Sequence, residues 1–204
     1  MPRDIITTVY TYGELSGEAQ ANARNWWTEI VENDDYAPPV IENALEVAKC
    51  LGIEIRDKGR GPACIYWSGF ASQGDGASFE GVFRPTGEAL AKVKEFAPLD
   101  ETLHGIARDL DIAYSLAGEF RCDVTTPRGS YCHSGTMDYE FDLDYDRSGT
   151  NEADKLVRQA LRRFADRIYS QLEESYFYVT SDEGVAETLH ANEYTFTAGG
   201  KRFG

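Results

Sequence analysis

Acidic and apolar residues alternate along residues 136–146, and this alternation constrains the fold more than any other feature of the sequence. Successive side chains of an extended strand point to opposite faces, so such a strand would have one apolar and one acidic face. The apolar face would carry Met137, Tyr139, Phe141, Leu143 and Tyr145. The acidic face would carry Asp138, Glu140, Asp142, Asp144 and Asp146. The segment therefore predicts a strand with five carboxylates on one face.

The rest of the chain mixes further strands with helices. β-Branched and aromatic residues predict strands at 5–10, 53–56, 63–70, 78–83, 119–126 and 193–197. Apolar residues at helical spacing predict helices at 16–31, 40–51, 87–96, 101–116, 151–178 and 181–191. Because strands and helices do not alternate regularly, the order predicts an α+β fold, with a mainly antiparallel sheet covered by helices and a long C-terminal helix. We expect residues 1–204 to form a single domain.

The formal net charge is −15, and residues 1–150 carry −13 of it. Such a field repels nucleic acid and anionic membranes and attracts basic surfaces, although it can also serve solubility alone. No window has the roughly 18 consecutive apolar residues of a membrane span, and the N-terminus lacks the apolar region of a signal peptide. We therefore expect a protein in the cytoplasm of a host cell that binds neither nucleic acid nor membranes directly.

The sequence offers no catalytic motif, so we predict no catalytic residue, no cofactor and no enzymatic activity. The histidines His104, His133 and His190 have no nucleophile partner at an informative spacing. Cys122, Cys132 and His133 could converge on a metal ion, although they lack the usual Cys-x-x-Cys spacing. The alternative is that the cysteines are free thiols of the core.

The acidic side of residues 136–146 admits several interpretations. Its carboxylates would lie roughly 6.7 Å apart, about twice the axial rise per phosphate of one DNA strand, so the row resembles a nucleic-acid backbone. A basic groove that holds DNA or RNA could accept it. The row could instead be a solvated face that Arg121 partly neutralises, a Ca²⁺ or Mg²⁺ site, or half of a metal-dependent nuclease site.

Charged residues outside this row have simpler interpretations. Gly74, Asp75 and Gly76 predict a turn between two strands, which could be a tight hairpin or a nest of amides for an anion. Asp75 is a further candidate for binding a partner. Four arginines of the long helix are expected to lie over the core or to pair with acids, namely Arg158, Arg162, Arg163 and Arg167.

Three parts of the sequence resemble an uncharacterised family of phage and prophage proteins. They are residues 10–16 with Ala19, Gln20, Trp26 and Trp27; residues 68–81; and residues 180–183 with 191–197. Members of that family are sometimes labelled antitoxins of a toxin–antitoxin stability system. The resemblance implies an accessory protein of a mobile element, such as an anti-CRISPR protein, and it transfers no catalytic residue. Acidic surfaces recur among such inhibitors, because their targets hold nucleic acid in basic channels.

We therefore expect a phage-encoded counter-defence inhibitor whose acidic, nucleic-acid-mimicking surface binds a basic surface of a host nucleic-acid-binding protein or complex. The residues expected to bind are Asp138, Glu140, Asp142, Asp144, Asp146 and Asp75. Two alternatives stay open: an antitoxin or regulator that binds a toxin, and a metal-dependent enzyme that uses the carboxylates of residues 138–146. The sequence does not fix the oligomeric state, and a homodimer stays open.

Overall fold

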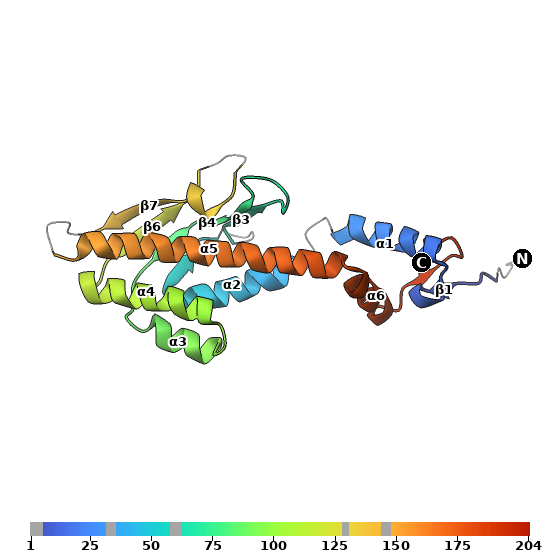
Figure 1. Ribbon diagram of the computed structural model, residues 1–204, viewed down its shortest axis with the longest axis horizontal. Helices are drawn as coiled ribbons and strands as arrows, with labels where there is room; N and C mark the ends of the chain where they lie inside the picture. Colours follow the sequence, from blue (N-terminus) through green and yellow to red (C-terminus); the bar gives the residue numbers. More distant parts are fainter. Residues whose placement is uncertain (1–5, 32–35, 58–62, 128–130, 144–147) are drawn as a thin grey trace, which may run out of the picture. The chain divides into compact units, whose positions relative to one another are not determined.

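The computed structural model describes residues 6–31, 36–57, 63–127, 131–143 and 148–204 (Figure 1). The contacts within the chain form two compact units. Unit 1 comprises Met1–Pro38 and Leu172–Gly204, and unit 2 comprises Pro39–Gln171. The single domain expected over residues 1–204 stays a prediction beside this division of the contacts.

Unit 2 is built on a four-stranded antiparallel sheet with the strand order β2-β5-β6-β7. A hairpin of β3 and β4 precedes β5, and only Glu80 separates β4 from β5. The register of the four-stranded sheet aligns two inward rows, Ile53–Phe83–Cys122–Phe141 and Ile55–Gly81–Val124–Tyr139. The strands are β2 (Ile53–Ile55), β3 (Ile65–Ser68), β4 (Gly76–Phe79), β5 (Gly81–Phe83), β6 (Arg121–Thr125) and β7 (Asp138–Asp142).

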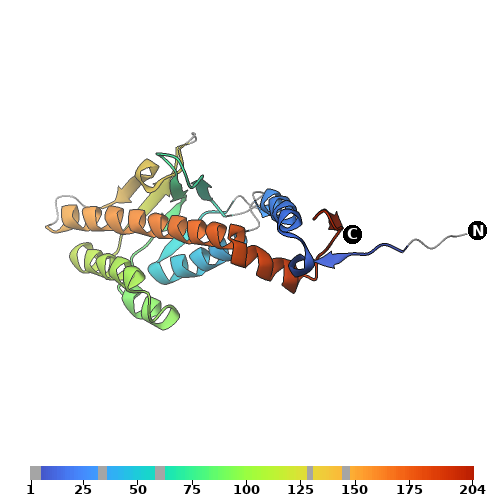
Figure 2. The ribbon, with the colours of Figure 1, turned by 45° about the vertical axis from the view of Figure 1, so that its right-hand side comes forward.

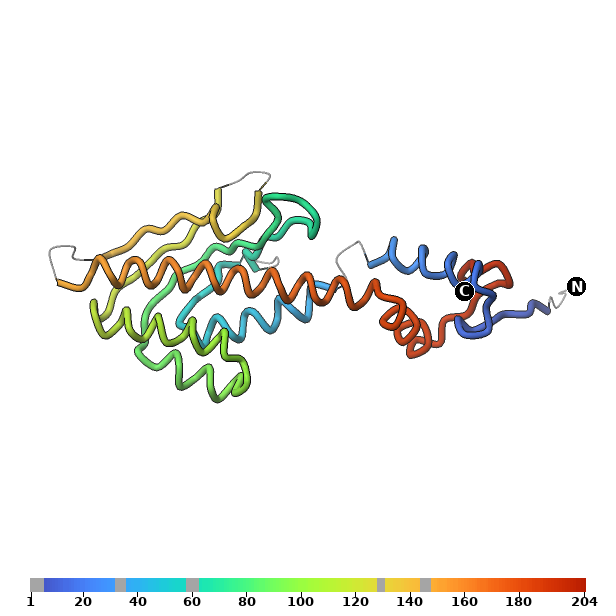
Figure 3. Tube along the Cα trace, viewed as in Figure 1, coloured from blue at the N-terminus to red at the C-terminus, as the bar shows by residue number. Residues whose placement is uncertain are grey.

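Helices pack against the inward side of these strands. Figure 1 shows β3, β4, β6 and β7 on one side of α5, and in the ribbon of Figure 2 and the trace of Figure 3 α4 lies beside α5 with α3 next to α4. The ring of Phe164 on α5 meets the ring of Phe79 on β4 edge to face, with centroids 5.6 Å apart. Unit 2 thus has a helical layer and a sheet layer. The helices are α2 (Pro38–Leu51), α3 (Ala89–Phe96), α4 (Glu101–Ala117) and α5 (Thr150–Thr180), the last of which continues into unit 1.

The local sequence explains where these helices begin and end. Asp100 caps α4, because its Oδ1 accepts a hydrogen bond from the amide of Leu103 at 2.8 Å. Gly52 ends α2, as predicted, since its φ of +77° favours glycine and a Cβ atom there would lie 2.4 Å from the carbonyl oxygen of Arg84. Fully buried residues recur every three or four positions along α5: Val157, Ala160, Leu161, Phe164, Ala165 and Ile168.

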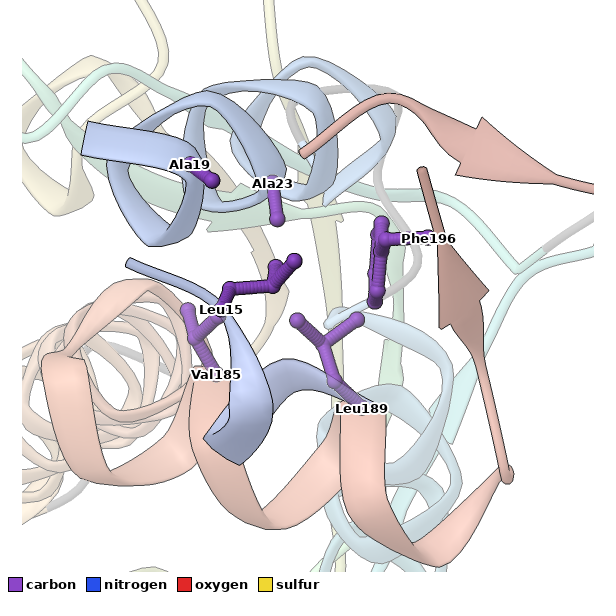
Figure 4. Close-up of a cluster of buried hydrophobic side chains, with 6 residues drawn as sticks. All are labelled: Leu15, Ala19, Ala23, Val185, Leu189 and Phe196. Carbon is purple, nitrogen blue, oxygen red and sulfur yellow. The ribbon is translucent and has the colours of Figure 1, made fainter. Parts of the chain in front are cut away.

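Unit 1 has a small core of its own. Figure 4 shows Leu15, Ala19 and Ala23 facing Val185, Leu189 and Phe196. Half-buried aromatic residues pack against this cluster: Tyr10, Tyr12, Trp26, Trp27 and Tyr194. Its elements are α1 (Gly17–Val31), the 3₁₀ turn η1 (Tyr12–Glu14), α6 (Asp182–Ala191), the end of α5, and a sheet with the order β1-β8-β9 formed by β1 (Tyr10–Thr11), β8 (Thr195–Phe196) and β9 (Arg202–Phe203).

The fold is α+β with antiparallel sheets and a long C-terminal helix, as the sequence predicts. All six predicted helices are confirmed within two residues at each end. The strand predicted at 5–10 is wrong over the described residues 6–9, because β8 is only two residues long and pairs with Tyr10 and Thr11 alone. The strand predicted at 78–83 is interrupted at Glu80, which separates β4 from β5.

The strand predicted at 136–146 is shorter than expected. Residues 134–136 form a 3₁₀ turn, η2 (Ser134–Thr136), and β7 begins only at Asp138. At its other end β7 stops at Asp142, which lies opposite Arg121, the first residue of β6. No residue of β6 remains to pair with Leu143. Residues 144–147 lie outside the described residues.

Candidate partner-binding surface

The alternation predicted for the acidic strand is confirmed over β7. Asp138, Glu140 and Asp142 are exposed, whereas Tyr139 and Phe141 are half-buried on the other face. The three exposed acids are called the acidic row below. Asp144 and Asp146, which were predicted to extend the row, lie outside the described residues.

Two arginines of α5 contact the aromatic rings on the inward face of β7. The guanidinium carbon of Arg158 lies 4.8 Å from the ring centroid of Phe141 and 5.2 Å from that of Tyr139, and Arg162 lies 5.9 Å from the Tyr139 ring. Burial raises the pKa of Tyr139 to about 12, so its hydroxyl stays neutral at physiological pH. Because these cations stack on the inward rings, they do not neutralise the outward acids.

The four arginines of α5 lie over the core or pair with acids, as predicted. Arg158 pairs with Asp154 on the preceding turn of α5. Arg163 pairs with Asp109 at 2.8 Å, and Arg167 pairs with the helix-capping Asp100 at 2.8 Å. This part of α5 therefore offers no unpaired cationic stripe that could bind nucleic acid.

The strands beside β7 carry acids that are matched by arginines. Arg121 donates from Nε to Oδ2 of Asp123 at 2.6 Å and from Nη2 to Oδ1 at 2.7 Å. These hydrogen bonds lower the pKa of Asp123. Two further pairs lie on or directly beside β2 and β5, namely Arg84–Glu54 at 3.3 Å and Arg56–Glu80 at 3.4 Å. Three arginines thus balance three acids on β2 and β6 and at the ends of β2 and β5.

The carboxylates of the acidic row are not matched by arginines in this way. Among the described residues, none forms an ion pair with Asp138, Glu140 or Asp142. Arg121 lies opposite Asp142 in the register, as the sequence suggested, but both of its hydrogen bonds go to Asp123. The excess negative charge of this face is therefore concentrated on the outermost strand.

Asp123 is the acid of β6 that the sequence did not single out. It lies directly opposite Glu140 in the register of β6 and β7. The signal was present, since Arg121, Asp123 and Thr125 alternate with the buried Cys122 and Val124 along β6. Only the pairing of the strands shows which acid of β7 it faces.

Asp75 has a different role from the acidic row. Its Oδ2 accepts hydrogen bonds from the amides of Ser72 at 2.6 Å and Ala71 at 3.0 Å, which lower the pKa of the carboxyl group. The segment is the turn of the β3–β4 hairpin, as one interpretation predicted. The Asp75 carboxylate already occupies these two amides, and the alternative of an anion-binding nest at residues 74–76 stays a prediction.

The described residues contain no group of three or more His, Cys, Asp or Glu side chains that could hold a metal ion. Cys122 lies on the inward face of β6, and burial raises the pKa of its thiol to about 12. His133 instead accepts a hydrogen bond at Nδ1 from the amide of Gly135 at 3.1 Å. Cys122, Cys132 and His133 therefore do not converge.

None of the helices in the described segments is long and apolar enough to cross a membrane.

Comparison with known proteins gives one match. Residues 36–182 match the model of a family described as a domain of unknown function, DUF8835. No curated protein and no solved structure matches the chain significantly. The matched residues include all of unit 2 and therefore the whole of the sheet that carries the acidic row.

Proposed function

Because the chain belongs to the DUF8835 family, whose function is unknown, we propose a function from the geometry of its sheet. The acidic row of β7 binds a basic surface of a partner protein, and this surface is one that otherwise binds nucleic acid. The protein then acts as a competitive inhibitor and needs no catalytic residue or cofactor. The observation that carries the proposal is the row itself: three exposed carboxylates on one strand, unpaired among the described residues.

The spacing of the row suits such a partner. Alternate residues of a strand lie roughly 6.7 Å apart, so Asp138, Glu140 and Asp142 present a regular line of charge. Arginines and lysines that line a nucleic-acid groove are arranged to contact such a line of phosphates. The flanking Arg121–Asp123 pair is neutral, which leaves the row as a narrow acidic stripe.

The resemblance to phage proteins that we inferred from three parts of the sequence suggests a particular setting. We propose that the partner is a component of a host defence complex, since such complexes hold DNA or guide RNA in basic channels. The chain would then work in the host cytoplasm as a counter-defence protein.

Charge pairing at an exposed rim contributes modest affinity. Exposed ion pairs contribute about 0–1 kcal/mol each, so three of them would strengthen binding by no more than about 3 kcal/mol. Their larger effect is on the rate of association and on its dependence on salt. We therefore expect the complex to weaken as the salt concentration rises.

The test replaces the three carboxylates of the acidic row with amides of nearly the same size and shape. The variant Asp138→Asn, Glu140→Gln, Asp142→Asn removes three charges, and the control Glu42→Gln, Glu95→Gln, Glu101→Gln removes three from exposed acids of α2, α3 and α4. Proteins captured from host lysate at low and high salt are identified, and their binding to DNA or RNA is measured with each variant. Wild type and control should displace the nucleic acid, and the row variant should not. Equal displacement by all three would contradict the proposal.

A further inference from the structure

The strand that carries the acidic row is the last strand of its sheet. β7 pairs with β6 on one side, and among the described residues no strand pairs with its other side. No backbone hydrogen bond outside that pairing reaches residues 138–142 from the described residues either. Alternate amide and carbonyl groups of an edge strand point away from its partner, and no described residue of this chain occupies those of β7.

The side chains of β7 determine which chain can pair there. An added strand would place every second side chain beside Asp138, Glu140 and Asp142, where lysine or arginine is favoured. The intervening side chains would lie beside Tyr139 and Phe141, whose half-buried rings favour apolar residues. The complementary segment therefore alternates basic and apolar residues.

The same charges disfavour a second copy of this chain. If two β7 strands paired antiparallel about Glu140, Asp138 of each would face Asp142 of the other, and Glu140 would face Glu140. Like charges directly opposite each other destabilise a strand pair. The acids thus protect the edge against self-association while leaving it open to a basic segment.

We propose that β7 binds an extended basic segment of its partner as a fifth strand of the β2-β5-β6-β7 sheet. This inference rests on the proposed function, since it specifies how the acidic row engages its partner. Backbone hydrogen bonds supply the affinity that three exposed ion pairs lack, and the alternating side chains supply the specificity.

Backbone methylation separates strand addition from simple charge attraction. The probe is a heptapeptide that alternates lysine with valine. In one derivative the amides of the lysines are N-methylated, and in another those of the valines. Only one of these sets can face β7, because successive amides of a strand point to opposite sides. We expect one derivative to bind as the parent does and the other to bind about tenfold more weakly or worse.

Binding is measured by fluorescence anisotropy with the full chain, its row variant and the charge-matched control. Equal loss for both derivatives, or no loss for either, overturns strand addition. If the row variant still binds the parent peptide more weakly than the control does, the proposed function survives that outcome. A parent peptide that does not bind the wild-type chain also overturns strand addition, and the displacement of nucleic acid from captured host proteins then decides the proposed function separately.

Discussion

Unit 2 buries its core between a sheet and a layer of helices, whereas unit 1 surrounds six buried residues with half-buried aromatic rings. In unit 2 the inward rows of the sheet make the core, and the outward face is left to solvent. In unit 1 the rings of Trp26 and Tyr194 meet edge to face and both contact the guanidinium of Arg202, so exposed and half-buried groups take part in packing. The exposed acids on the outward face of unit 2 can therefore be replaced without opening a cavity in its core.

The distribution of charge sharpens this difference. The sequence of unit 1 has 4 Lys and Arg against 13 Asp and Glu, a net charge of −9, and that of unit 2 has 16 against 22, a net charge of −6. Net charge would therefore point to unit 1 as the acidic part. The acidic row of unit 2 stands out through its arrangement, since its three carboxylates share one edge strand and form no ion pair with a described residue.

The largest expected effect is on the core of unit 2. Phe164→Ala removes a fully buried ring that packs on Phe79, and such truncations cost about 3–5 kcal/mol of the free energy of unfolding. Urea unfolding measures the total loss of the free energy of unfolding. Hydrogen exchange, followed on peptide fragments of the protein, shows in which unit the loss occurs. Loss of protection confined to residues 39–171 would show that the units unfold separately. Equal loss in both units would show that they unfold together and that the comparison concerns packing alone.

A smaller effect is expected in the core of unit 1. Leu189→Ala opens a cavity beside Phe196, and we expect a loss of about 2–3 kcal/mol, in the lower part of the range for such changes. The value is lower because this core is small and its half-buried rings can move into the space. Hydrogen exchange should report the loss in α1 and α6. A loss as large as that of Phe164→Ala would contradict the idea that unit 1 can collapse around a cavity.

Both units show what the sequence can predict and where it stops. Helix α5 was predicted because its apolar residues recur at helical spacing over many turns, which fixes the helix regardless of its neighbours. The row of β7 was predicted because alternation needs only an extended chain. The strand predicted at 5–10 was placed too early and β9 was not predicted at all, since two-residue strands are fixed by their partner β8 and not by local propensity.

Dependence on long-range strand pairing also limits what the sequence can predict about the face that carries the acidic row. Sequence alone placed Arg121 near the acidic row, and the register confirms that it lies opposite Asp142. It could not show that Arg121 bonds to Asp123, because the choice depends on which carboxylate lies within reach of a folded side chain. Nor could it show that β7 is an edge strand, since strand order is set by long-range pairing.

An intermediate effect is expected where α4 meets α5 in unit 2. Asp100 caps α4 and pairs with Arg167, so Asp100→Ala should cost about 1–2 kcal/mol of the free energy of unfolding. Asp100→Asn is the control, because asparagine keeps the capping oxygen but places an amide NH2 where Oδ2 accepts from Arg167, so only the ion pair with its hydrogen bonds is lost. It should therefore cost less. If the two variants were equally destabilised, the ion pair and not the cap would account for the effect.

The same residue predicts a dependence on pH. Burial raises the pKa of Asp100, but the hydrogen bonds from Leu103 and Arg167 outweigh burial, and the net pKa is lowered. A carboxyl group with a lowered pKa stabilises the fold above its unfolded pKa of about 4, and this contribution is lost as the pH falls below that value. Wild type should therefore lose more stability than Asp100→Asn between neutral pH and about pH 3. Parallel stability curves for the two proteins would contradict this assignment.

The smallest effect is expected from a single hydrogen bond in unit 1. The indole Nε1 of Trp27 donates to the carbonyl oxygen of Val179 at 3.0 Å, and this bond ties α1 to the end of α5 within the unit. Trp27→Phe keeps an aromatic ring but removes the donor, so we expect a loss of about 0.5–1.5 kcal/mol. Trp26→Phe is the control, because Trp26 packs through ring contacts with Tyr194 and Phe196. Faster hydrogen exchange at the end of α5 in Trp27→Phe alone would show that this bond holds the helices of unit 1 together, whereas equal changes in both variants would mean that ring packing alone does so.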